Sequence, residues 1–268
     1  MRYAAVLPGG TATTQLEQAV LAEQSGWDGV FVPEIAYGTD PWSLLAAIAM
    51  RTSRIRLGTM LTPLPWRRPW KLASQVATVH QLSGGRAILA VGIGAADEVL
   101  PATGEITGVR ERAERLDEGI DLIRALWAGQ KSFRGQHYQY EGGQLDLAAD
   151  VAPGEPGIPL WVVGLWPRPK SMRRVLRCDG IIPQYSLDGR EAGPADARAV
   201  RDWLAGHAMP AGFDLISEGE TPAGDPAAAA AQVLPWAQAG CTWWLETRWT
   251  GGPGEMLSRL AAGPPRGP

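Results

Sequence analysis

The sequence predicts an α/β protein with a single (β/α)8 TIM barrel, and three observations support this prediction. Short apolar runs rich in β-branched residues alternate with longer amphipathic stretches, which is the pattern of parallel strands joined by helices. Eight such runs occur, and most begin roughly 20 to 30 residues apart, which is one strand plus one helix each time. The length of 268 residues matches the ~250 residues typical of this barrel.

The eight predicted strands combine β-branched or aromatic residues with turn signals near their ends. They occupy residues 2–7, 28–33, 54–61, 86–93, 159–164, 180–184, 212–217 and 242–246. The fourth and fifth strands are much further apart along the chain than the others. An insertion is therefore expected between them.

Several of the intervening stretches carry signals that begin a helix. Thr14 and Glu17 have capping-box spacing ahead of an apolar stretch. Asp–Pro pairs at 40–41 and 225–226 each combine an N-cap residue with a first-turn proline. The longest predicted helix covers 109–127, where apolar residues recur on one face and therefore predict core packing.

The chain is expected to form one barrel domain over residues 1–262. The longest helix, an aromatic and Gly-rich hairpin at 132–147 and an Ala/Pro/Gly-rich linker at 148–157 make up an excursion at about 109–157. Residues 263–268, rich in Gly and Pro, are expected to be a flexible tail.

Composition excludes several classes of function. The net charge is −3, with 25 basic and 28 acidic residues, so no broad basic field exists for nucleic acid or an anionic membrane. Two cysteines and three histidines make neither a disulfide framework nor a metal-ligand cluster, so no metal is expected. The sequence shows no signal peptide and no membrane span, which predicts a cytoplasmic protein with a small-molecule ligand.

Four loops are candidates for chemistry, because the functional groups of this barrel lie after the carboxyl ends of the strands. These loops cover 33–38, 61–66, 92–96 and 164–171. Glu34 in the first loop is a carboxylate at the barrel mouth, a place where a carboxyl group can serve as a catalytic acid or base. A solvated or salt-bridged glutamate is the alternative.

The loop at 164–171 has the features of an anion site. Gly164 ends a buried strand, Arg168 and Lys170 follow it, and Ser171 opens the next helix. Backbone N–H groups, the helix dipole and positive charge would then converge on a phosphate. The alternative is that the two basic side chains only solvate a loop.

The other loops offer glycine and aromatic residues. The turn at 92–94 lets the backbone approach a flat ligand, although its two glycines also suit any tight turn. Trp66 and Trp166 lie on ligand-side loops and, with Tyr37, are candidate walls for a substrate or an aromatic cofactor.

Ordered blocks over nearly the whole chain resemble the luciferase-like flavin-dependent monooxygenases and oxidoreductases. The most specific stretch runs from Arg-Pro-Trp-Lys-Leu-Ala at 68–73 through Leu-Ser-Gly-Gly-Arg at 82–86 to Val-Gly-Ile-Gly at 91–94. Further blocks stand at 22–29, 40–42, 46–49, 52–59, 159–164, 178–180 and 240–246.

The resemblance implies a barrel that binds FMN or the deazaflavin coenzyme F420 at the carboxyl ends of its strands. It places the ring against the ends of strands two to four, and the phosphate near the loop after strand five and the following helix. The cofactor-binding residues expected on this basis are Met60, Leu61, Thr62, Gly92, Ile93, Gly94, Gly164, Leu165, Arg168, Lys170 and Ser171. A non-proline cis peptide is expected near residues 60–62.

The sequence also departs from the family pattern. Many relatives carry an Asp–His pair after strand two, where this chain has Pro33-Glu34-Ile35, and some carry a Glu after the strand-four glycines, where it has Ala95-Ala96. Glu34 is therefore the remaining carboxylate candidate for catalysis. FMN is expected ahead of F420 because the deazaflavin-type pair is missing.

The resemblance implies an oxidoreductase or monooxygenase in which the reduced cofactor activates O₂ or passes a hydride to a small organic substrate. It allows a separate flavin or F420 reductase and a homodimer as partners. The alternative is a catalytically degenerate barrel that binds flavin or a small ligand as a carrier, sensor or partner subunit. A phosphate-binding hydrolase or isomerase on the same fold is a weaker third hypothesis, since no nucleophile–base pair stands out.

Overall fold

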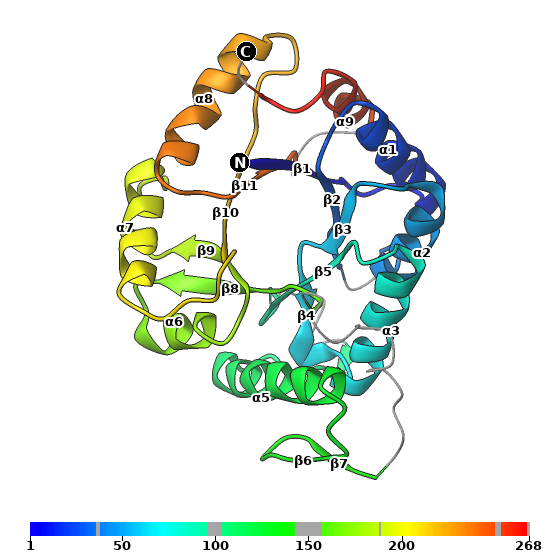
Figure 1. Cartoon of the computed structure of the whole chain (residues 1–268), viewed down its shortest axis with the longest axis vertical. Coiled ribbons are helices and arrows are strands. Elements are labelled where there is room, and N and C mark those ends of the chain that lie inside the picture. Colours follow the sequence, from blue (N-terminus) through cyan, green and yellow to red (C-terminus); the bar gives the residue numbers. More distant parts are fainter. Residues whose placement is uncertain (36–37, 96–102, 143–156, 188, 250–252, 267–268) are drawn as a thin grey trace.

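A closed barrel of parallel strands, ringed by helices, forms the body of the protein (Figure 1). The structure is a computed structural model that describes residues 1–35, 38–95, 103–142, 157–187, 189–249 and 253–266. Within these residues, no helix is long and apolar enough to cross a membrane.

All eight predicted strands are confirmed. They are β1 (Arg2–Val6), β2 (Gly29–Val32), β3 (Arg56–Thr59), β5 (Ala87–Gly92), β8 (Leu160–Trp166), β9 (Gly180–Tyr185), β10 (Asp214–Gly219) and β11 (Trp243–Glu246). Neighbouring strands pair in chain order, and the barrel closes where β1 pairs with β11. A short strand, β4 (Thr62–Pro63), extends the pairing along β5 at the carboxyl end. Every strand therefore ends at the same rim.

The helices cover the outside of the barrel (Figure 1). They are α1 (Ala12–Gln24), α2 (Pro41–Arg51), α3 (Pro69–Leu82), α5 (Val109–Trp127), α6 (Pro169–Val175), α7 (Pro194–Ala205), α8 (Pro226–Gln238) and α9 (Pro253–Ala261), with the short 3-10 helix η1 at Leu64–Trp66.

Helix starts follow the predicted signals with one correction. Asp40 and Asp225 cap α2 and α8, accepting from the amides of Ser43 and Ala228 at 2.8 and 2.9 Å. The capping-box prediction at Thr14 is wrong, because α1 begins earlier: Thr11 is its N-cap and accepts from the amide of Thr14 at 3.1 Å.

An aromatic layer fills the centre of the barrel. Phe31 stacks on Trp161 with ring centroids 5.3 Å apart, and Trp243 packs edge-on against Trp161 at 5.4 Å. Gly58 leaves room for this layer, since a Cβ there would lie 2.5 Å from the Phe31 ring. The interior is therefore packed with side chains, which leaves the mouth above it as the place for a ligand among the described residues.

Acidic residues tie the strands together at the amino-terminal end. Asp28 accepts from the amide of Tyr3 at 2.9 Å, and Asp179 accepts from the amide of Leu160 at 2.9 Å. Arg266 also donates to Asp28 at 2.8 Å and Pro265 is buried. Residues 263–266 of the expected flexible tail are thus packed against the barrel.

The excursion after α5 contains the predicted hairpin. Strands β6 (Ser132–Arg134) and β7 (Gln139–Glu141) pair antiparallel and lie beyond α5, outside the ring of helices (Figure 1). The Glu118 carboxylate on α5 accepts from the amides of Gln136, His137 and Tyr138 at 2.5–3.0 Å. The predicted linker lies outside the described residues, apart from Gly157.

Candidate functional site

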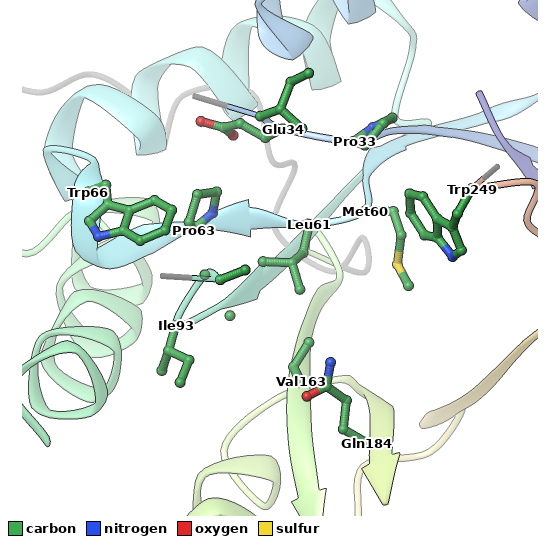
Figure 2. Close-up of a pocket in the computed structure, with 14 residues that line it drawn as sticks. Pro33, Glu34, Met60, Leu61, Pro63, Trp66, Ile93, Val163, Gln184 and Trp249 are labelled. Atoms are coloured by element: carbon green, nitrogen blue, oxygen red, sulfur yellow. The ribbon is translucent and has the colours of Figure 1, made fainter. Parts of the chain in front are cut away.

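A cavity of about 410 Å³ opens at the carboxyl ends of the strands. Residues at or just after the ends of β2, β3, β5, β8 and β9 line it, together with Pro63 of β4, Trp66 of η1 and Trp249 after β11. Trp66 and Trp249 stand on opposite sides with Leu61 between them, and Gln184 and Val163 lie on the side away from Glu34 (Figure 2). The cavity is therefore mainly apolar, with a few polar groups at its edge, which is the usual character of a small-molecule site.

The end of β3 forms the central wall. The Met60–Leu61 peptide bond is cis, as the family resemblance implies. Met60 and Leu61 both line the cavity. The Thr62 side chain is fully buried behind this wall, where its hydroxyl accepts from Trp42 Nε1 at 3.2 Å and donates to Thr59 Oγ1 at 3.0 Å. Thr62 therefore supports the wall and does not line the cavity.

The turn after β5 forms the adjoining wall. Gly92, Ile93 and Gly94 all line the cavity. Gly94 has a φ of +76°, and a Cβ there would lie 2.5 Å from Trp66. Arg112 holds the turn in place by donating to the carbonyls of Ile93 and Gly94 at 3.0 and 2.6 Å. The missing side chain at Gly94 is thus what allows the Trp66 ring to pack against this turn.

Glu34 is the acid at the cavity. Arg67 Nε donates to its Oε1 at 2.6 Å, and Arg67 also reaches Asp40 at 3.3 Å. The Glu34 side chain is only 10% exposed. Its second oxygen, Oε2, is buried and has no hydrogen-bond partner in the described part of the chain.

The pKa of Glu34 follows from these surroundings. Burial raises the pKa above the usual glutamate value, while the Arg67 guanidinium acts in the opposite direction and offsets it only in part. The unpartnered Oε2 is thus an oxygen at which a proton can be exchanged with a bound molecule.

A second depression of about 400 Å³ adjoins the cavity beyond Glu34 and Trp66. Asp40, Arg67 and Glu105 line it, so it is more polar than the main cavity. Because Glu34 and Trp66 line both spaces, they form the boundary between them.

Sequence reasoning missed three groups at the site. Arg67, the partner of Glu34, follows the loop after strand three. Gln184 lines the cavity from the end of β9, and Trp249, 57% exposed, lines it from the loop after β11. The rule that loops after strand ends carry function would have included Gln184 and Trp249 if it had been applied to strands six and eight.

The residues after β8 lie elsewhere. A Cβ at Gly164 would lie 2.7 Å from Ile181 and 2.9 Å from Val175, so this glycine lets α6 pack against the barrel. The Leu165 amide donates to Ser171 Oγ at 2.9 Å. None of these residues is part of the cavity lining within the described chain.

The basic residues and the tryptophan of this segment are also absent from the cavity lining within the described chain. Arg168 and Lys170 are exposed, and Lys170 lies in a separate depression between α5 and α6 with Asp117 and Arg173. Trp166 packs edge-on against Trp203 on α7 at 6.1 Å. Phosphate binding here stays a prediction. Tyr37, a predicted substrate residue, lies outside the described residues.

Comparison with known proteins shows one family and one fold. The F420-dependent glucose-6-phosphate dehydrogenase of Nocardia farcinica (strain IFM 10152) is 38% identical over 156 residues, which cover 54% of this chain and 45% of that protein. The chain thus spans about half the length of the curated relatives it matches.

Two solved structures share the barrel. An F420-dependent secondary alcohol dehydrogenase in complex with an F420–acetone adduct matches with a TM-score of 0.76 and 16% identity, covering 97% of both chains. The oxygenating constituent of 3,6-diketocamphane monooxygenase from Pseudomonas putida, in complex with FMN, matches with a TM-score of 0.53 and 18% identity, covering 89% of this chain and 62% of that one. The luciferase-like monooxygenase family matches residues 3–252. The chain belongs to this family.

Proposed function

We propose that the chain is an oxidoreductase that binds coenzyme F420 at the barrel mouth and transfers a hydride between it and a small organic substrate. The observation that carries this proposal is the apolar cavity at the strand ends, whose buried polar atom, Glu34 Oε2, has no partner among the described residues. The F420-dependent relatives favour F420 over FMN, which reverses the order expected from the missing Asp–His pair.

The residues present fit a flavin-type cofactor. Such a ring has two apolar faces and a polar edge. Leu61, Ile93 and Val163 offer apolar contacts, and Glu34 offers an acceptor or donor at the rim of the cavity (Figure 2). When bound, the reduced cofactor supplies the hydride, and in the case of FMN it can also react with O₂.

The chain's own groups then bind and orient the substrate and move a proton. Glu34 Oε2 exchanges the proton that a carbonyl or hydroxyl substrate gains or loses during reduction or oxidation. Arg67 holds the carboxylate in place through Oε1 and leaves Oε2 free for this exchange. Met60, Leu61 and Trp66 exclude water from the reacting groups, which strengthens the electrostatic interactions there.

FMN-dependent monooxygenation is the second candidate. It is favoured by the sequence Pro33-Glu34-Ile35 and by Ala95-Ala96, where relatives that use the deazaflavin have acidic or Asp–His residues. In that case a separate flavin reductase is the expected partner, since reduced FMN must be supplied. With F420, an F420 reductase or a second substrate has the same role.

Separate titrations of the purified protein with F420 and FMN, followed by absorbance and fluorescence, test the proposal. We expect F420 to bind with a Kd well below ~1 mM, which corresponds to about −4 kcal/mol. Loaded protein is then assayed anaerobically with alcohols and carbonyl compounds, and aerobically for O₂ uptake. Binding of neither cofactor contradicts the proposal, and binding without turnover by wild type on any substrate favours a degenerate barrel.

The variant Glu34→Gln identifies the proton-exchanging group. It should retain cofactor binding, because the glutamine amide still offers a donor and an acceptor at this position. It should lose kcat, because proton exchange by a positioned group contributes about 10²–10⁴-fold. Unchanged kcat in this variant would exclude Glu34 as the catalytic residue.

A further inference from the structure

Glu218 on β10 faces the barrel lumen. Residues paired between parallel strands point to the same side of the sheet, and side chains alternate along each strand. Ile216 pairs with Trp243 and Glu218 pairs with Leu245. Ile216, Trp243 and Leu245 belong to the buried cluster inside the barrel. Glu218 therefore points inward, one layer above Ile216 and at the carboxyl end.

Gln184 is its neighbour on β9. The two strands pair only at Asp214–Gly180 and Leu215–Ile181. Three residues beyond the last pair, Glu218 and Gln184 occupy equivalent positions at the carboxyl ends of the two strands, and Gln184 lines the main cavity. Glu218 thus lies at the rim of the barrel beside the main cavity, next to a residue that lines it, and is not itself part of the cavity lining.

The two strands separate above their paired residues, and a space of about 260 Å³ opens there. Ile182, Tyr185 and Glu218 are among the residues that line it. Pro183, which has no N–H to donate, lies in this part of β9. The Glu218 side chain therefore has room around it and stays open to a ligand.

No cation balances Glu218 among the described residues. The Glu218 residue is exposed to solvent at the barrel mouth. Partial desolvation by the surrounding strand ends raises the pKa of its carboxyl, and no charged group acts against this effect. The nearby arginines already have partners: Arg67 donates to Glu34, and Arg112 donates to the backbone carbonyls at 93–94. Arg248 donates to the Thr221 carbonyl. No basic side chain of the described residues lines the main cavity or the space beside Glu218.

The rest of the sequence does not change this balance. Residues 36–37, 96–102, 143–156, 188, 250–252 and 267–268 contain no Lys, Arg or His. Recognition of a phosphate group relies on cationic side chains, above all Arg and Lys. A phosphorylated substrate, of the kind named for the Nocardia farcinica relative, would meet the Glu34 and Glu218 carboxylates here, and the Arg67 guanidinium beside the cavity is already paired with Glu34.

We propose that Glu218 is a specificity-determining residue that selects substrates carrying an ammonium group and disfavours phosphorylated ones. This inference rests on the proposed function, because it assigns a substrate class to the barrel mouth where the cofactor would bind. The carboxylate would accept from the ammonium group, while the apolar body of the substrate packs against Val163 and Trp249. An ammonium group close to Glu218 also favours the ionised carboxylate.

The test uses four aromatic probes of similar size that differ in their polar group: benzylamine, benzyl alcohol, benzoate and phenyl phosphate. Their Kd values are measured by calorimetry on the cofactor-loaded protein and on the cofactor-free protein. We expect benzylamine to bind at least about tenfold tighter than either anion, a difference of about 1.4 kcal/mol. Benzyl alcohol should fall between them.

Two variants assign the preference to Glu218. Glu218→Gln should lose most of the preference for benzylamine, and Glu218→Lys should bind phenyl phosphate more tightly than benzylamine. The matched control is Glu17→Gln, which makes the same charge change at an exposed position on α1 and should behave as wild type. Thermal melting of each variant verifies that it is folded.

Several results would overturn the inference: anions that bind as tightly as benzylamine, no binding of benzylamine, or a wild-type preference in Glu218→Gln. Cofactor titrations on the same samples separate this inference from the proposed function. Cofactor binding without an amine preference contradicts only the inference about Glu218. An amine preference without cofactor binding contradicts only the proposed function.

Discussion

Replacing Gly94 by alanine tests whether this glycine shapes the cavity wall. The backbone at Gly94 has a φ of +76°, and a Cβ there would lie 2.5 Å from the Trp66 ring and 2.8 Å from Pro63. A left-handed φ costs a residue with a side chain about 1–2 kcal/mol. Forcing extra atoms into a packed site costs about 1–3 kcal/mol more.

Gly84→Ala is the matched control, because Gly84 has a φ of +63° and nothing within 4 Å of its would-be Cβ. It should bear only the backbone cost. The two variants are therefore expected to differ by about 1–3 kcal/mol, which for a chain of this size is a Tm difference of roughly 2–12 °C.

The assay combines thermal unfolding with cofactor titration. Gly94→Ala should lower the Tm further than Gly84→Ala and weaken cofactor binding, because Trp66 must move and its hydrogen bond from Nε1 to the Ile106 carbonyl is strained. Equal Tm losses in both variants, or unchanged cofactor affinity in Gly94→Ala, would refute the packing argument.

Three further predictions concern other residues. Burial raises the pKa of Glu34, so folding favours its protonated form. That contribution to stability is present below the ordinary glutamate pKa and is lost as pH rises through the raised pKa. The unfolding midpoint of wild type should therefore fall relative to that of Glu34→Gln as pH rises above the ordinary glutamate pKa. An equal pH dependence in both proteins would contradict this sign. Glu118→Ala should loosen the hairpin at β6 and β7, because three amides lose their acceptor, at a cost of about 1–3 kcal/mol each as an upper limit. Hydrogen exchange at the amides of Gln136, His137 and Tyr138 measures this loosening, and unchanged protection of these amides contradicts the prediction. Trp249→Phe should alter the free energy of unfolding by less than about 0.5 kcal/mol, because Trp249 is 57% exposed. The variant should nevertheless lose part of the tryptophan fluorescence that the bound cofactor quenches. An unchanged quenched fraction would place Trp249 away from the ligand.

Much of the candidate site could be predicted from the loops that follow the strands. Glu34, Met60, Leu61 and the turn at 92–94 line the cavity, as does Trp66. The rule that barrel chemistry lies at the carboxyl ends supplied these residues, since every parallel strand ends at the same rim. The rule was also sufficient to reach Gln184 and Trp249.

The direction of a side chain could not be predicted in the same way. Trp166 ends β8 and Lys170 follows it, yet Trp166 packs against Trp203 on α7, and Lys170 lines a separate depression with Asp117 of α5. Ser171 is occupied by the amide of Leu165. These contacts depend on helices that are distant in sequence, so a local reading of residues 164–171 could not foresee them.

The sequence by itself determined the number and order of the strands and the rim at which chemistry occurs, because period and turn signals are local properties of the chain. Only the tertiary structure decided which carboxylate is paired and which is not. Arg67 reaches Glu34 across 33 positions of sequence, and the register with β11 turns Glu218 inward. Both depend on packing between strands and loops that composition and spacing do not specify.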